Sequence, residues 1–208
     1  MNLDYELRGI IDTFYVSHPA PLNMNPVDAA EQYHKMEPEM TVELWRSYYS
    51  LGDVLTSQYD ALREIGIEFV FVSGEPHNSS RSMFAEVAQR RLTVRKSLGD
   101  DYTDIPIPHL MAQSFLTIDG KMLLNDVFRA VHDVLGHYAI RASFGQDGEA
   151  LAWLHHRSLL PRITHQALWC ETRGQNTWTN FWGNHQSLPN RERPFPVQKY
   201  GSVPGEFL

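Results

Sequence analysis

The chain has 208 residues, of which 42% are hydrophobic, and a formal net charge of −7. This length can bury a core within a single domain without disulfides, and Cys170 is the only cysteine. The acidic balance argues against unaided binding to nucleic acid or to anionic membranes, because phosphate contact requires clustered Lys and Arg.

The sequence also bears on location. Residues 1–6 have neither a basic n-region nor an apolar h-region, so no secretory signal is expected. No uncharged apolar run approaches the roughly 18 residues that cross a bilayer. A single cysteine is typical of a reducing compartment. We therefore expect a cytoplasmic protein without a membrane partner.

Apolar periodicity predicts three helices in the first third of the chain. The first covers residues 3–14, and the second begins with Asn25 as N-cap and Pro26 in the first turn. Thr41 caps a long third helix that Gly66 ends. Residues 67–72 are short, β-branched and aromatic, which predicts the one convincing strand, and a helix is expected over 82–92.

Residues 97–121 are loop-like, and a loop of this length is a candidate lid. Three helices are expected after it, over about 123–137, 147–160 and 161–180. The fold class is therefore mainly α with a minor strand element, as one helical domain at 1–182. Residues 183–208 contain four prolines and predict an irregular arm, laid over the core or over a second copy of the chain.

Two histidines stand out in the helix expected over 123–137. His132 is in line with Leu124, Phe128 and Leu135, so it points into the apolar stripe. On a regular helix His137 lies about 140° further round, and it reaches the same point only if the helix ends or distorts. Gly136 stands where such a break is cheap.

Glu171 is the third candidate ligand. It falls on the inward face of the last predicted helix, where a carboxylate is costly unless it is paired or bound to metal. Two imidazoles and one carboxylate facing a core suggest a metal with open coordination positions. The alternative is that both histidines are satisfied core residues and that Glu171 pairs with an arginine.

The run from His132 to His137 resembles the His-(Asp/Glu)-x-x-Gly-His signature of the aromatic amino acid hydroxylases, which are pterin-dependent iron monooxygenases. The third iron ligand of that family is a Glu on a later helix, and Glu171 stands in the corresponding place, 39 residues after His132. The resemblance implies a reduced hydroxylase-like core with iron(II) on His132, His137 and Glu171. It covers roughly a quarter of the chain.

The resemblance has two departures. Tyr138-Ala139 replaces the family's Val-Pro, and no counterpart of the pterin-binding stretch is found, so pterin is not expected. Manganese and zinc remain alternative metals. The run from Glu171 to Asn176 also resembles uncharacterised phage-encoded proteins.

Four further residues are candidates for catalysis. Glu149 could be a fourth ligand, a salt-bridge partner or an acceptor for an imidazole N–H, and we favour the last role. Arg173, Gln175 and Asn176 form a polar cluster between tryptophans that could orient a small-molecule substrate, or could simply cap a helix end.

These residues lead to the hypothesis of an iron(II)-dependent, hydroxylase-like monooxygenase. One rival is a His-Asp-type metal-dependent phosphohydrolase, in which His109 and Asp147 would flank His132-Asp133. The other is a non-enzymatic protein with a buried polar network or a stabilising metal.

Overall fold

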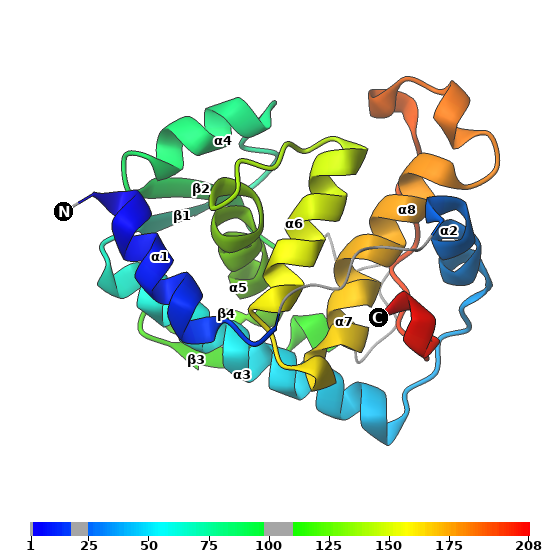
Figure 1. Ribbon diagram of the computed structural model, residues 1–208, viewed down its shortest axis with the longest axis horizontal. Coiled ribbons are helices and arrows are strands. Elements are labelled where there is room, and N and C mark those ends of the chain that lie inside the picture. Colours follow the sequence, from blue (N-terminus) through cyan, green and yellow to red (C-terminus); the bar gives the residue numbers. More distant parts are fainter. Residues whose placement is uncertain (1, 18–24, 98–109) are drawn as a thin grey trace.

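Figure 1 shows the computed structural model of the chain, in which residues 2–17, 25–97 and 110–208 are described. The fold is mostly helical, as predicted, and the described residues also form two small sheets. The helices are α1 (Leu3–Phe14), α2 (Pro26–Lys35), α3 (Val42–Glu64), α4 (Ser80–Val87), α5 (Leu124–Val131), α6 (Gln146–Ser158), α7 (His165–Trp169) and α8 (Gln175–Phe181). The strands are β1 (Glu68–Val72), β2 (Arg91–Arg95), β3 (Ser114–Thr117) and β4 (Gly120–Leu123).

The second and third helices begin at the caps that the sequence predicts. The Asn25 side chain accepts a hydrogen bond from the backbone N–H of Val27 at 3.0 Å, and Thr41 accepts one from Leu44 at 3.1 Å. Gly66 follows α3 with a φ of +88°, a conformation that favours glycine. These predictions are confirmed.

Helix α3 is the platform on which the C-terminal helices rest. It runs along the base of the molecule in Figure 1 and contacts α1, α5 and α7. Its buried face supplies much of the hydrophobic core, through Leu44, Tyr48, Leu51, Leu55, Tyr59 and Leu62. This face therefore fixes the helices that carry the candidate site.

Strands β1 and β2 form a parallel pair joined by α4, with Phe69 opposite Leu92. The sequence predicts β1 correctly but extends the next helix too far, since α4 ends at Val87 and β2 follows it. Leu92 and Val94 point inward from β2. This alternation spans only five residues, and such a short strand is easily hidden beside a helical pattern.

The structure corrects part of the prediction of a loop over residues 97–121. The candidate lid falls mainly on residues 98–109, which lie outside the described residues. From Ser114 the loop prediction is wrong, because β3 and β4 form an antiparallel hairpin with Ser114 opposite Leu123. The backbone N–H of Ile118 in its turn donates to Asp60 on α3 at 2.8 Å.

The three helices predicted for the second half are present, with local departures. Helix α5 continues into a π-helical segment, His132–Tyr138. Helices α7 and α8 are joined through a second π-helical segment, Cys170–Gly174, into one continuous helix. Helix α6 lies between these two long helices and contacts both π-helical segments (Figure 1).

After α8 the chain forms only short 3-10 turns, at His185–Ser187, Asn190–Glu192 and Gly205–Phe207. It returns to the helices, where the backbone N–H of Lys199 donates to the Tyr33 hydroxyl at 3.0 Å. The Gln166 amide donates to the Gly201 carbonyl at 3.1 Å. The C-terminal segment is therefore held against α2 and α7.

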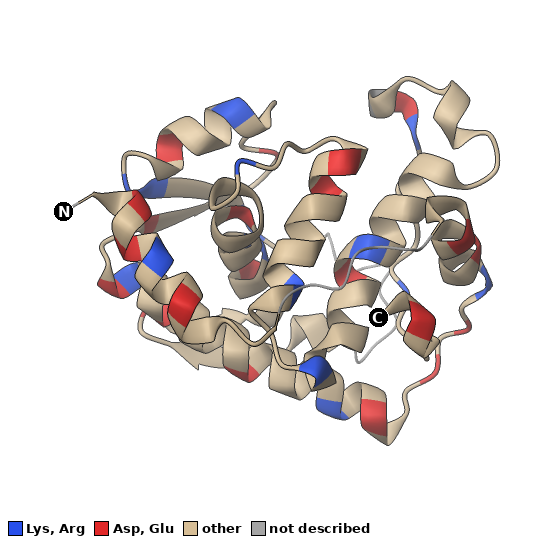
Figure 2. Cartoon of the chain, viewed as in Figure 1, with Lys and Arg blue, Asp and Glu red and all other residues tan. Residues whose placement is uncertain are grey.

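Acidic and basic residues are interspersed over the elements, as Figure 2 shows. Arg63, for example, forks onto the Asp119 carboxylate at 2.7 and 3.2 Å. Within the described part of the chain, no helix combines the length and apolar character that a bilayer span requires.

Candidate metal centre

The π-helical segment brings His132 and His137 together. Its backbone hydrogen bonds span five residues, as from the N–H of Ala139 to the Val134 carbonyl at 2.9 Å. Residues five apart therefore lie almost one above the other, whereas a regular α-helix would separate them by about 140°. The two imidazole centroids are 5.0 Å apart. The distortion that the sequence required is thus a widening of the helix.

Gly136 makes room for the His132 ring. A Cβ at this position would lie 2.9 Å from His132 Nδ1 and 3.0 Å from its Cε1. The sequence suggested that Gly136 would end the helix, but the helix continues through it to Tyr138. A glycine is needed here because the Cβ of any other residue would collide with the His132 ring.

A hydrogen-bond chain fixes the tautomer of His132. The Gln58 amide donates to the Leu159 carbonyl at 3.1 Å, so its oxygen faces His156 Nε2 at 3.2 Å and accepts that proton. His156 Nδ1 is then an acceptor and lies 3.0 Å from His132 Nδ1, which donates to it. The lone pair of His132 is therefore on Nε2, the atom that can bind a metal.

His137 is held in the same tautomer by the backbone. Its Nδ1 lies 3.1 Å from the Ala142 carbonyl, which can only accept, so Nδ1 carries a proton. Its Nε2 lies 3.5 Å from Glu149 Oε1. The His137 side chain is 2% exposed and that of Glu149 is 24% exposed.

His132, His137 and Glu149 together form a potential metal site. One ligand atom from each lies within 4.8 Å of the other two. Two imidazoles and one carboxylate suit iron, zinc or manganese, and both imidazoles donate their second N–H to a fixed acceptor, as metal ligands usually do. The residues therefore fit a divalent ion.

The surroundings shift the pKa values of the two candidate histidine ligands in opposite directions. Burial, together with His137 and His156, lowers the pKa of His132 well below its ordinary value, so this imidazole is neutral. Burial also lowers the pKa of His137, but the hydrogen bond and charge of Glu149 and the charge of Asp133 outweigh it, and the net pKa is raised. The raised pKa of His137 favours a proton on this imidazole, which faces the Glu149 carboxylate at 3.5 Å in the metal-free site.

Glu171 lies outside this group, although the sequence proposed it as the third ligand. Its carboxylate accepts hydrogen bonds from the Tyr48 hydroxyl and the Gln198 amide, and one from Gln175 at 3.3 Å. Burial raises the pKa of Glu171 to about 7 despite these donors. The structure brings Glu149 to the histidines instead.

The other proposed residues do not share one set of contacts. The Gln175 amide donates a hydrogen bond to the Glu171 carboxylate, and the Asn176 side-chain oxygen accepts one from the Asn180 amide at 3.3 Å. Arg173 is 5% exposed and has no hydrogen-bond or ion-pair partner among the described residues. The polar cluster is therefore not a single pocket around Glu171.

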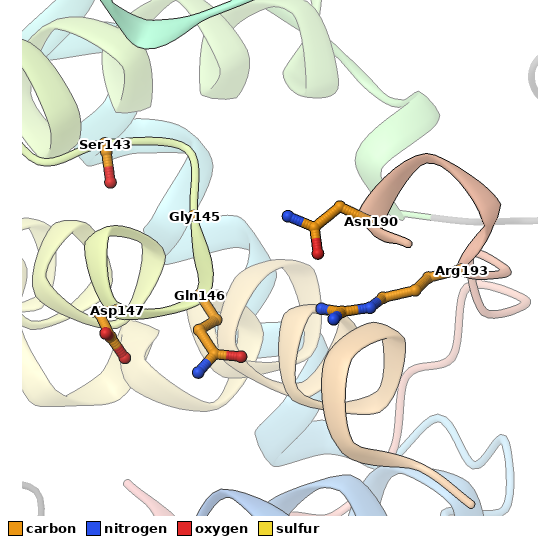
Figure 3. A pocket seen from close by; sticks show the side chains of 6 residues that line it. All are labelled: Ser143, Gly145, Gln146, Asp147, Asn190 and Arg193. Carbon is orange, nitrogen blue, oxygen red and sulfur yellow. The ribbon is translucent and has the colours of Figure 1, made fainter. Parts of the chain in front are cut away.

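A cleft of about 300 Å³ lies at the start of α6. Asn190 and Arg193 point into it from the C-terminal segment, opposite Gln146 (Figure 3). The phosphohydrolase hypothesis would use Asp147 as a metal ligand. Asp147 lines this cleft and does not belong to the candidate metal-binding group of His132, His137 and Glu149. His109, the other flanking ligand of that hypothesis, lies outside the described residues.

The roles of His156 and Gln58 were missed from the sequence. His156 follows Glu149 by seven residues on α6, so the two share a helix face. That spacing could have connected both to one site. The participation of Gln58 on α3 has no signal in the sequence.

Comparisons of the chain with protein-family models, with curated proteins and with solved structures find no match. Of the resemblance to the aromatic amino acid hydroxylases, the structure supports only a cluster of two histidines and a glutamate that could hold a metal.

Gly136→Ala should lower stability, because the new methyl group collides with the His132 ring. We expect a loss of about 2 kcal/mol, as overpacking a buried site typically costs. Gly9→Ala is the control: it lies in α1 with nothing within 4 Å of its Cβ position, and should gain about 0.5–1 kcal/mol from helix propensity. Urea denaturation followed by circular dichroism measures both. Equal gains in the two variants would contradict the ring placement.

Glu171 should make the metal-free protein less stable as the pH rises. Its folded pKa of about 7 exceeds its ordinary value of 4.5, so the stabilising proton is fully bound below pH 4.5 and is lost as the pH passes 7. The loss is on the order of 3 kcal/mol, at 1.36 kcal/mol per pKa unit.

Urea midpoints between pH 4.5 and 8, measured with a chelator present, test this dependence. Glu171→Gln should flatten it, whereas Glu31→Gln, at an exposed residue paired with Lys35, should leave it unchanged. The idea fails if the Glu171 variant keeps the full slope.

The His132 tautomer can be observed directly. Nitrogen-15 NMR of the metal-free protein should show His132 protonated on Nδ1 only. Gln58→Leu removes the acceptor of His156 and should shift His132 toward a mixture of tautomers. An unchanged His132 spectrum in that variant would disprove the hydrogen-bond chain.

Proposed function

We propose that this protein is a mononuclear metal enzyme of the iron(II)-dependent, hydroxylase-like oxygenase class, with His132, His137 and Glu149 as its ligands. The observation that carries the proposal is the convergence of these three side chains within 4.8 Å, with Nε2 of His132 left without a proton. Two-histidine, one-carboxylate sets with open positions are typical of non-haem iron oxygenases.

The chain contributes position and environment. The Nδ1 atoms of His132 and His137 are anchored to His156 and to the Ala142 carbonyl, which orients both Nε2 atoms before a metal arrives. Phe128 stacks on His132 with centroids 5.4 Å apart, and Phe144 meets His137 edge-on at 5.1 Å. These rings limit water around the ligands.

Iron(II) in this site would supply the activation of dioxygen for oxidation of a small substrate. The Glu149 side chain is 24% exposed, so the proposed site contacts solvent on the side of this carboxylate.

An open catalytic centre fits the geometry better than a closed structural one. Structural zinc sites usually have four protein ligands, whereas catalytic sites have three and keep a free position. Among the residues that the structure describes, the group contains three, and one of them is partly exposed. A His2Glu set also occurs in zinc hydrolases, so hydrolysis remains the alternative activity.

Metal titration tests the ligand set. Purified anaerobically and loaded with iron(II) or cobalt(II), the wild type should bind one ion per chain. His132→Ala and Glu149→Gln should each weaken binding at least tenfold, because each removes a ligand, while Glu171→Gln should bind as the wild type does. The reverse behaviour of the two glutamate variants would move the third ligand to Glu171, and no binding by the wild type would end the proposal.

Activity then separates the chemistries. The iron(II)-loaded protein should consume dioxygen with ascorbate as reductant, and the His132→Ala variant should not. Nucleotide or ester hydrolysis by the zinc-loaded protein, without oxygen uptake by the iron form, would identify a hydrolase instead.

A further inference from the structure

Arg173 is a buried arginine in the continuous helix formed by α7 and α8. The residue is 5% exposed, and its Nε is enclosed without a hydrogen bond among the described residues. In the part of the chain that the structure describes, no carboxylate, carbonyl or ring contacts its guanidinium. Arginine remains charged at neutral pH, so this is a buried, unbalanced positive charge.

Two other arginines, Arg63 and Arg157, have the side-chain partners that Arg173 lacks among the described residues. Arg63 binds both oxygens of Asp119, and that hydrogen bond raises its pKa. Arg157 donates to His165 and lies over the Trp153 ring at 5.2 Å. Burial alone lowers the pKa of Arg173, with no compensating carboxylate among the described residues. An uncompensated buried charge is unfavourable, and a bound anion would offset that cost.

The position of Arg173 is rigid. It belongs to the π-helical segment Cys170–Gly174, and such segments are frequent at functional sites. A Cβ at Gly174 would lie 2.4 Å from the Tyr33 ring and 2.7 Å from the Trp169 ring, so this backbone is closely packed. Glu171, two residues earlier, directs its carboxylate to Tyr48, Gln175 and Gln198.

We propose that Arg173 anchors a binding site for a small molecule carrying a carboxylate group. The guanidinium fork matches the two oxygens of a carboxylate, and one negative charge neutralises the buried cation. A phosphate carries close to two charges at pH 7 and would leave a net negative charge in the same place. The carboxylate is therefore the oxyanion that suits a single arginine. This site goes beyond the proposed metal chemistry and does not depend on it.

The smallest carboxylates, formate and acetate, are suitable probes because they carry only the recognised group. Added to the metal-free protein at constant ionic strength, they should raise the wild-type melting temperature saturably and shift the Arg173 Nε–H resonance in nitrogen-15 NMR. Arg173→Met should lose the response, with at least tenfold weaker binding. Without probe it should melt at or above the wild-type temperature, because it removes an unpaired buried charge.

Arg63→Met is the matched control. It breaks the pair with Asp119, so it should melt below the wild type yet keep the formate response. Should Arg173→Met fail to fold, Arg173→Lys keeps the charge without the fork and should weaken formate binding at least tenfold.

The proposal is overturned if formate leaves the wild-type melting temperature and the Arg173 resonance unchanged. It is also overturned if a folded Arg173→Met, or Arg173→Lys in its place, retains the response, or if phosphate binds Arg173 in preference to formate. Because every measurement is made on the metal-free protein, failure of the metal proposal would not affect the result.

Discussion

The five-residue hydrogen bonding of His132–Tyr138 is the constraint on which the candidate centre depends. An α-helix would direct His137 away from His132, and no choice of rotamer corrects a divergence of about 140°. The π-helical geometry is rare because its packing and hydrogen bonds are less favourable, so it persists where surrounding contacts hold it. Here α6 packs along the segment and the His132 ring covers Gly136.

Helix α6 also supplies the rest of the centre. Glu149 approaches His137 from one end of its inner face, and His156, two turns later, holds His132 from the other. A shift of α6 along its axis would therefore disturb both histidines together. Gln58 extends the chain of contacts to α3, which is the packing platform of the fold. The metal-binding geometry is thus tied to the main hydrophobic core.

Sequence reasoning succeeded where the cause is local. Asn25, Thr41 and Gly66 act through their own backbone neighbours, so helix starts and stops were predictable. The strand β1 was visible from its composition. The hairpin of β3 and β4 was missed because its few residues carry a weak alternation, and β2 because it follows α4 so closely.

The candidate site was predictable only in part, because some of its contacts are local and others depend on how distant helices pack. His132 could be assigned to the inner face from the apolar stripe, and the need for a distortion before His137 followed from helix geometry. Which carboxylate approaches them depends on how α6 and the last helix pack, and inward-facing patterns on both helices are equally compatible with either answer. Glu149 and Glu171 both meet the pattern, and only the tertiary arrangement distinguishes them.

The charges of the candidate metal centre differ between the metal-free protein and the protein with a bound cation. Without a cation, the lowered pKa of His132 keeps this imidazole neutral, and the raised pKa of His137 favours a proton on that ring beside Glu149. A divalent cation would displace that proton and leave one excess positive charge beside Glu149. Burial raises the pKa of the neighbouring Asp133 carboxyl to about 7, and the charge of His137 acts against that rise. A cation nearby favours the ionised carboxylate still more strongly.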